Sequence, residues 1–408
     1  MSAPLFSPFA PGFREDPYPH YHRLREEDPV HQTAGGYWLL TAYDDIAAFL
    51  HDRRASSRGA GRMAGGGQPA PAGGMLSRTQ DSWVLFREPP DHTYLRRTLN
   101  PGFTPKAIAG LRDHVERHAQ ALIEPLLEEG QMDLVADFAY PLATDMICEL
   151  VGVPRVDRDK CHRWMIDILE VIHGGRFGTG TDLPEPESIA ASRSAHRAFF
   201  EYFGQLAMDR RESPKDDLIS LLVETQDRDG RLDTHDVVAN ALMMFAAGHD
   251  TTVGLVGNSA IALHDHPEQL EQVRARGLDS TGLDELLRHA GPVHAVVRIA
   301  LEDLDYGGKT IEKGSNVLAI LPAANRDPSH FPDPDKLDLD RRDARALAFG
   351  LGIHYCIGAP LARLETEIAL GMLIRSTKDL EVGTEAVVWG SSLEFRTPRR
   401  VPLTFTAA

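Results

Sequence analysis

Cysteine is scarce in this chain of 408 residues, and its three cysteines, Cys148, Cys161 and Cys356, form no CxxC pair. Neither a disulfide scaffold nor a cysteine-rich zinc site is indicated, and a reducing compartment fits best. Basic residues are also few: the chain has 43 Lys and Arg but 60 Asp and Glu, which gives a formal net charge of −17. Such an acidic protein is a poor partner for an anionic nucleic-acid backbone, so we expect none.

Long hydrophobic runs are missing as well. The longest, such as Ala241 to Gly248, are far too short to cross a bilayer. The first twenty residues lack the basic start and the uninterrupted apolar stretch of a signal peptide. We therefore expect a cytoplasmic protein without a membrane anchor. Hydrophobic residues make up 42% and charged residues 25%, which is typical of a globular chain rather than a disordered one.

The hydrophobic periodicity predicts a mainly α-helical protein with a small β portion. Helical patterns cover residues 18–27, most of 92–226, 283–290 and 359–376. The longest helix should begin at Asp233 or Thr234, which can cap free backbone amides, and end near His264 before Pro267 opens the next helix. Short β patterns occur at residues 29–32, 37–41, 293–300, 306–311 and 317–321. Residues 59–74 hold seven glycines and two prolines and are predicted to form a lid or loop.

One cysteine stands in an unusual setting. In the segment 348–365, AFGLGIHYCIGAPLARLE, a glycine-rich loop delivers Cys356 to the start of an amphipathic helix. Free amides at a helix start lower a thiol pKa and favour a thiolate that can bind a metal. Cys148 and Cys161 are better interpreted as packing residues. We expect Gly350, Gly352 and Gly358 to let the backbone approach a flat ligand.

The string Phe349-Gly350-Leu351-Gly352-Ile353-His354-Tyr355-Cys356-Ile357-Gly358 resembles the haem-binding signature of the cytochrome P-450 superfamily. Four further motifs occur in the order and spacing of that family, so the resemblance covers nearly the whole chain. It implies a single haem-thiolate monooxygenase domain over residues 1–408. Its cofactor would be haem b, held between the long central helix and the helix after the cysteine loop, with Cys356 as the axial ligand of the iron.

The motif Ala247-Gly248-His249-Asp250-Thr251-Thr252 lies in the middle of the long helix. From the residues alone, small side chains open a notch, and a carboxylate beside hydroxyls can relay protons. Threonines that bond back to helix carbonyls, beside a solvated Asp250, are the plainer alternative. The resemblance implies that the notch at Gly248 admits dioxygen, and that Thr251 and Asp250 bring protons to the reaction. It favours monooxygenation over peroxide-driven relatives that lack this pair.

Two groups of charged residues complete the resemblance. Glu285 and Arg288 form an ExxR pair, which the family buries as a structural lock with a third basic residue; at its expected position this chain has Lys336. Arg298 in an apolar strand calls for a buried anion. The resemblance implies that two haem propionates are bound by His92, Arg96, Arg298 and His354.

The reaction implied is hydroxylation or epoxidation of a bulky hydrophobic small molecule with O2, as a tailoring step in secondary metabolism. Substrate contacts are expected at Phe86, Met243, Met244, Ala247, Ala295, Val296 and Leu393. The glycine-rich lid agrees with such a pocket. An oxidative coupling or ring-forming enzyme remains an alternative, because the motifs do not reveal the substrate. A non-catalytic haem-thiolate sensor is another, although it would not need Asp250 and Thr251.

Electrons must come from other proteins, since the chain leaves no room for a fused flavin or iron-sulfur domain. We expect a monomer reduced by a ferredoxin or flavodoxin and its reductase, so that NAD(P)H acts only indirectly; no GxGxxG follows Gly350. From Tyr94 to Arg112 there are four bases, Arg96, Arg97, Lys106 and Arg112, and no acid. This local basic surface is predicted to dock an acidic redox partner.

Overall fold

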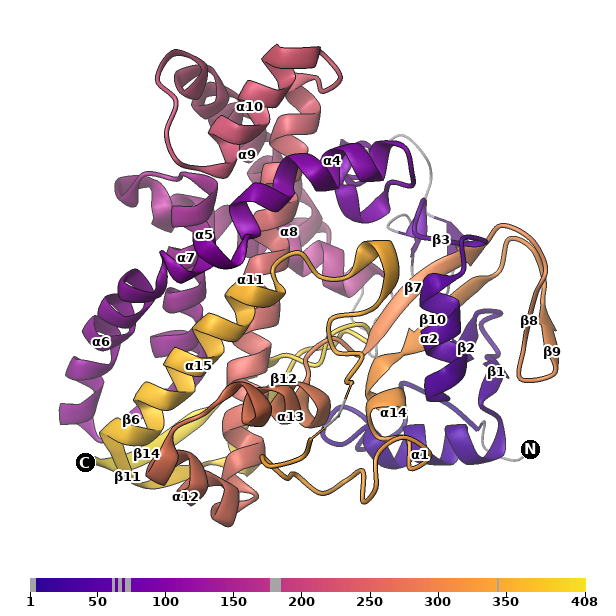
Figure 1. The fold of residues 1–408 in the computed structure, drawn as a ribbon, viewed down its shortest axis with the longest axis vertical. Helices are drawn as coiled ribbons and strands as arrows, with labels where there is room; N and C mark the ends of the chain where they lie inside the picture. The colour runs from indigo at the N-terminus through magenta and orange to yellow at the C-terminus, as the bar shows by residue number, and fades with distance from the viewer. Residues whose placement is uncertain (1–4, 61–62, 65–67, 70–74, 177–184, 343–344) are drawn as a thin grey trace.

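Helices dominate the structure, a computed structural model that describes residues 5–60, 63–64, 68–69, 75–176, 185–342 and 345–408 (Figure 1). The mainly α architecture with a small β portion confirms the prediction. The helices are α1 (Tyr18–Glu27), α2 (Tyr43–His51), α3 (Met75–Ser82), α4 (Asp91–Leu99), α5 (Pro105–Ala109), α6 (Arg112–Glu129), α7 (Tyr140–Val151), α8 (Arg158–Arg176), α9 (Pro186–Glu212), α10 (Leu218–Asp229), α11 (Thr234–His264), α12 (Pro267–Arg276), α13 (Ser280–Ala290), α14 (Leu321–Asn325) and α15 (Ala359–Ser376).

The main sheet has five strands in the order β1-β2-β10-β7-β3, and only the β2–β10 pair is parallel. Its strands are β1 (Val30–Gln32), β2 (Trp38–Leu40), β3 (Ala55–Ser56), β7 (Ala295–Ala300) and β10 (Asn316–Ile320). The smaller sheets use β4 (Met63–Ala64), β5 (Gln68–Pro69), β6 (Gln131–Asp133), β8 (Leu304–Tyr306), β9 (Lys309–Ile311), β11 (Thr377–Val382), β12 (Val388–Trp389), β13 (Pro398–Arg400) and β14 (Pro402–Ala407).

The long helix α11 runs through the protein as predicted, and α15 lies beside it (Figure 1). Asp233 accepts a hydrogen bond from the Asp236 amide while the Asp236 side chain accepts one from the Asp233 amide, which fixes the start of the helix. Most α11 side chains are buried among α7, α9 and α15. The segment from Ala247 to Thr252 is therefore held on a helix that is almost fully buried.

Two details of the β portion differ from the prediction. The run 306–311 is not one strand: β8 and β9 pair across Gly307 and Gly308, both of which have positive φ angles. The run 317–321 ends as a strand at Ile320, because α14 begins at Leu321 with Pro322 in its first turn. Most of the predicted lid at 59–74 lies outside the described residues, but β4 and β5 pair antiparallel within it.

Among the residues that the structure describes, no helix is long and apolar enough to span a membrane.

Candidate active site

Cys356 lies in the loop that enters α15, two residues before Gly358, the N-cap of that helix. Its amide donates to the Phe349 carbonyl at 3.0 Å, which closes the loop. The two glycines before Cys356 are required by the backbone conformation. Gly350 and Gly352 have φ angles of +69° and +73°, which other residues rarely adopt. Gly358 agrees better with the expectation that a glycine lets the backbone approach a ligand. Among the described residues, and apart from its own chain neighbours, a Cβ at Gly358 would meet no atom closer than the Cys356 Sγ, at 3.9 Å.

The start of α15 supplies donors to the sulfur. Burial raises the pKa of the Cys356 thiol, and this is opposed by hydrogen bonds from the backbone amides of Gly358 and Ala359 and by the charge of Arg96. These donors favour the thiolate, which is the form that binds a metal. Burial nevertheless outweighs them, so the lowered thiol pKa predicted from the helix start is wrong for the protein without a bound metal.

The four residues expected at the propionates gather in one place, which we call the cation cluster (His92, Arg96, Arg298 and His354). The His92 and His354 ring centroids are 4.4 Å apart. Arg298 is only 6% exposed on β7, and its Nη1 donates a hydrogen bond to the neighbouring Val297 carbonyl at 2.8 Å. Burial lowers the pKa of Arg298 to about 10.

The cation cluster fits a group with two carboxylates. Neither Arg96 nor Arg298 has a carboxylate within 4.0 Å in the described part of the chain. Burial, together with the nearby His354 and Arg96, lowers the pKa of His92 to about 4. A guanidinium as buried as that of Arg298 is costly without an ion pair, so an anion is expected between it and the half-buried Arg96. Two propionates of a haem would satisfy this requirement, and Cys356 is the residue that would ligate its iron.

Glu88 is a member of this neighbourhood that the sequence reasoning missed. Its Oε1 accepts hydrogen bonds from the Ser56 hydroxyl and the Ser57 amide, each at 2.8 Å. The Ser57 hydroxyl also lies 3.1 Å from His354 Nε2. Glu88 directly precedes the Pro-Pro-Asp-His string, but only the folded contacts reveal that it reaches β3 and the cysteine loop.

The motif on α11 faces an open space. Ala247 is exposed and Thr251 is half-buried, although the helix is otherwise buried from Val237 to Ala260 apart from Ala246 and Gly248. Residues four apart lie on one face of a helix, so this break is a single exposed patch. The Thr251 hydroxyl donates to the Ala247 carbonyl at 2.7 Å, which is the back-bond of the plainer alternative.

Asp250 is not the solvated charge of that alternative. It is 4% exposed, and its Oδ2 lies 3.4 Å from Nη1 of Arg399 on β13. The Arg399 side chain is 44% exposed and so links the buried carboxylate to the surface. Gly248 has a packing role beside the expected notch, because a Cβ there would lie 2.8 Å from Ile147 Cδ1 on α7.

A second buried carboxyl joins α11 to α15 and was also missed. Glu365 is 2% exposed, and it forms a side-chain hydrogen bond with Thr252. Burial raises the pKa of Glu365 to about 8, an effect that the bond to Thr252 only partly opposes. Two buried carboxyl groups, Asp250 and Glu365, therefore lie near Thr251.

The ExxR pair is buried, and its third member differs from the expected position. Arg288 donates to both oxygens of Glu285, with Nε at 2.6 Å and Nη2 at 2.7 Å. The second guanidinium on Glu285 belongs to Arg341, at 3.2 Å, and not to Lys336. Lys336 is exposed and supplies only its backbone carbonyl to Arg288, at 3.0 Å. Arg341 lies five residues beyond Lys336 and reaches Glu285 through Nε alone, while its two Nη atoms donate to backbone carbonyls, including that of Pro332 at 2.7 Å.

The expected substrate residues fall into different environments. Ala247 faces the open space on α11, and Val296 is half-buried on β7. The others, Phe86, Met243, Met244, Ala295 and Leu393, are buried. Met243 lies one helical turn before Ala247, so it borders the same face of α11.

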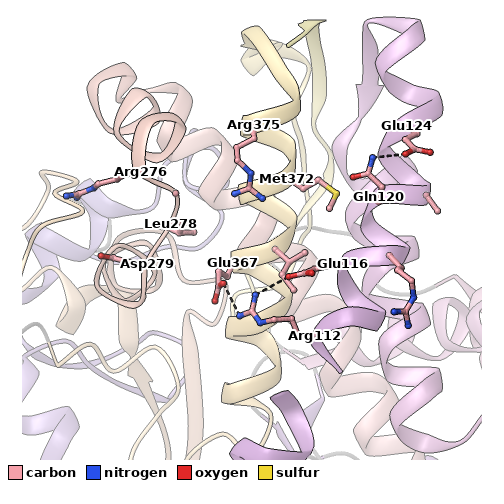
Figure 2. Close-up of a pocket in the computed structure, with 14 residues that line it drawn as sticks. Arg112, Glu116, Gln120, Glu124, Arg276, Leu278, Asp279, Glu367, Met372 and Arg375 are labelled. Carbon is pink, nitrogen blue, oxygen red and sulfur yellow. Dashed lines mark hydrogen bonds and ion pairs between the residues drawn. The ribbon is translucent and has the colours of Figure 1, made fainter. Parts of the chain in front are cut away.

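A separate groove of about 820 Å³ lies between α6, α15 and the turn from α12 to α13 (Figure 2). There Arg112 donates to Glu116 at 3.3 Å and to Glu367 at 3.0 Å. With Arg96 assigned to the haem, three bases are predicted to dock a partner, and one of them, Arg112, is therefore already paired. Arg97 and Lys106 are exposed, and neither has an ion pair in the described ranges.

The cysteine loop, the cation cluster and the acid-alcohol pair on α11 are the three parts that the sequence motifs predicted for a haem-thiolate site. A sequence profile described as Cytochrome P450 matches residues 38–276 and 280–378. The chain belongs to the cytochrome P450 family and is a cytochrome P450 monooxygenase that takes haem as its cofactor.

Three relatives illustrate its place in the family. It is 36% identical to the cytochrome P450 monooxygenase PikC of Streptomyces venezuelae, over 96% of this chain and 91% of that protein. It is 35% identical to the 6-deoxyerythronolide B hydroxylase of Saccharopolyspora erythraea, over 96% of both chains. The crystal structure of CalO2 superimposes with a TM-score of 0.89 at 30% identity, over 98% of both chains. These matches confirm the resemblance and the fold expected from the motifs.

Proposed function

We propose that the protein is a single haem-thiolate domain that hydroxylates or epoxidises a bulky hydrophobic natural product, as a tailoring step in secondary metabolism. The observation that carries this proposal is the exposed patch at Ala247 and Thr251 on an otherwise buried helix, directly beside the buried Asp250. The names of PikC and of the 6-deoxyerythronolide B hydroxylase support a macrolide or polyketide substrate class.

In this proposal Cys356 ligates haem b, and His92, Arg96, Arg298 and His354 hold its propionates. When bound, the haem activates dioxygen, so that one oxygen atom enters the substrate and the other leaves as water. Phe349 and Gly350 shape the loop around the sulfur. Thr251 orients a proton donor at its hydroxyl, and Asp250 supplies protons there, with the partly exposed Arg399 linking its buried carboxylate to the surface.

Electrons come from NAD(P)H through a reductase and a ferredoxin or flavodoxin that docks at Arg97 and Lys106. Both residues are exposed near α4, the helix that carries His92 and Arg96. The reaction takes place in the cytoplasm, in a monomer. Ala247, Met243 and Val296 line the substrate side of the haem, together with Phe86, Met244, Ala295 and Leu393.

The test begins with a spin-state screen of the holoprotein against a library of hydrophobic natural products. Each compound that shifts the Soret band is then turned over with a surrogate ferredoxin, its reductase and ¹⁸O2. We expect a product that has gained one ¹⁸O atom. A product two hydrogens lighter without oxygen would instead support a coupling or ring-forming enzyme. The absence of any product, despite reduction of the ligand-bound protein, would favour the sensor and overturn the proposal.

A further inference from the structure

A fixed carboxylate of the protein itself, that of Glu88, lies beside the cation cluster. Glu88 Oε1 accepts hydrogen bonds from the Ser56 hydroxyl at 2.8 Å, the Ser57 amide at 2.8 Å and the Ser57 hydroxyl at 3.2 Å. Its Oε2 lies 3.9 Å from His354 Nε2. Three donors on β3 and the residue after it thus hold the carboxylate in one position, beside the residues that face the propionates.

This carboxylate is ionised. Burial alone would raise the pKa of Glu88, but the nearby His354, 3.9 Å away, and the hydrogen bonds from Ser56 and Ser57 outweigh burial and lower it to about 2. The charge of Glu88 also acts on Arg298 and His92, because it opposes the lowering of their pKa values by burial. Glu88 is therefore electrostatically coupled to the cluster as a whole.

A charge balance shows what this means once haem is bound. Arg96 and Arg298 carry permanent positive charges, and two propionates would neutralise them. Glu88 adds one negative charge to this balance. Replacing Glu88 by a neutral residue therefore makes the site more positive by one charge, whatever the states of His92 and His354. A negative charge near a metal centre disfavours the reduced, more electron-rich state.

We propose that Glu88 is a positioning residue that keeps the haem site one charge more negative and thereby holds the reduction potential of the bound haem low. It thus sets the driving force that a redox partner must supply. The inference rests on the proposed binding of haem at the cation cluster. Sequence motifs do not assign this role to Glu88, and no other carboxylate in the described part of the chain lies within 4.0 Å of a member of the cluster.

The experiment compares midpoint potentials of the haem-loaded protein by spectroelectrochemical titration. Glu88→Gln keeps the side-chain shape and removes the charge. Asp91→Asn is the matched control. Asp91 is exposed and lies three residues after Glu88, so this substitution removes the same charge from a residue outside the cluster. Glu88→Ala removes the charge and the hydrogen bonds, whereas Glu88→Asp restores the charge on a shorter side chain.

We expect a more positive potential for Glu88→Gln and for Glu88→Ala, and values close to the wild type for Glu88→Asp and Asp91→Asn. The Ala, Asp and Asn variants still decide the question if the Gln variant does not fold. Wild-type potentials in both neutral variants, or an equal shift in Asp91→Asn, would overturn the proposal. Only protein with the carbon monoxide band of thiolate ligation is titrated, so failure of the haem assignment itself would appear before any potential is measured.

Discussion

The carboxyl of Glu365 on α15 is hydrogen-bonded to Thr252 on α11. A buried, protonated carboxyl thus links the helix after the cysteine loop to the helix with the acid-alcohol pair. The bond lies next to Thr251, whose hydroxyl is on the open side of α11. A carboxylic acid that stays protonated at neutral pH has consequences for stability that can be measured directly.

Stability should depend on pH through Glu365. Its folded-state pKa of about 8 exceeds the ordinary value of 4.5, so the folded state binds the proton more tightly than the unfolded state. The contribution is fully present below pH 4.5 and is lost as pH rises through 8. Glu365→Gln stays neutral and keeps a hydrogen bond to Thr252. Between pH 5 and 9 it should gain stability relative to the wild type, by roughly 1 to 4 kcal/mol in urea unfolding. A difference that is constant over this range would contradict the assignment.

The lock around Glu285 should be strong, and its strength should not involve the Lys336 side chain. Glu285→Gln leaves the buried Arg288 and Arg341 without their anion and should cost about 3 kcal/mol or more. Arg341→Ala removes one of the two guanidinium groups and should cost about 1 to 3 kcal/mol. Lys336→Ala is the control and should stay within about 0.5 kcal/mol, because its exposed side chain makes no bond to Glu285. Equal costs for Lys336→Ala and Arg341→Ala would restore the prediction made from the sequence.

Proton delivery should fail differently in two variants. Asp250→Asn removes the acid and should slow turnover about 10- to 100-fold, since proton transfer by a positioned group contributes factors of this size. Thr251→Ala leaves the acid in place and should keep electron consumption while less product and more hydrogen peroxide form. The measurement is product and peroxide per NADPH consumed with a surrogate ferredoxin system. An unchanged product yield in Thr251→Ala would remove that residue from the relay.

Partner docking should depend on Arg97 and Lys106 and much less on Arg112. Arg97→Gln combined with Lys106→Gln should slow reduction by an acidic ferredoxin about 3- to 10-fold at low ionic strength and flatten its salt dependence. Arg112→Gln is the matched control, because Glu116 and Glu367 already pair with that guanidinium (Figure 2). Stopped-flow reduction under carbon monoxide reports the rates. A larger effect in Arg112→Gln would place the docking surface over the groove beside α15.

Local signals in the sequence predicted much of this fold. Capping residues and prolines mark the ends of α11 and the start of α12, and alternation of apolar residues marks the strands of the main sheet. Cys356 and the cation cluster were predicted through motifs whose spacing is fixed by one family. The α-helical class, the central helix and the placement of the cysteine before α15 follow from such short-range patterns.

What the sequence left out are contacts between distant segments. Glu88, Glu365 and Arg399 each act through a partner on another element, and no local pattern marks them. Arg341 was not predicted because Lys336 occupies the position expected for the third basic residue. Only the folded chain shows that the arginine five residues later contacts Glu285. Tertiary geometry decides which of many charged residues are buried and paired.

The most direct test of the account is the reduced, carbon monoxide-bound spectrum of the protein and of Cys356→Ala. We predict the red-shifted Soret band of thiolate-ligated haem in the wild type and its loss in the variant, while Cys148→Ala and Cys161→Ala keep the band. A wild-type protein that binds haem without this band, or a Cys356→Ala variant that retains it, would contradict the assignment of Cys356 as the haem ligand.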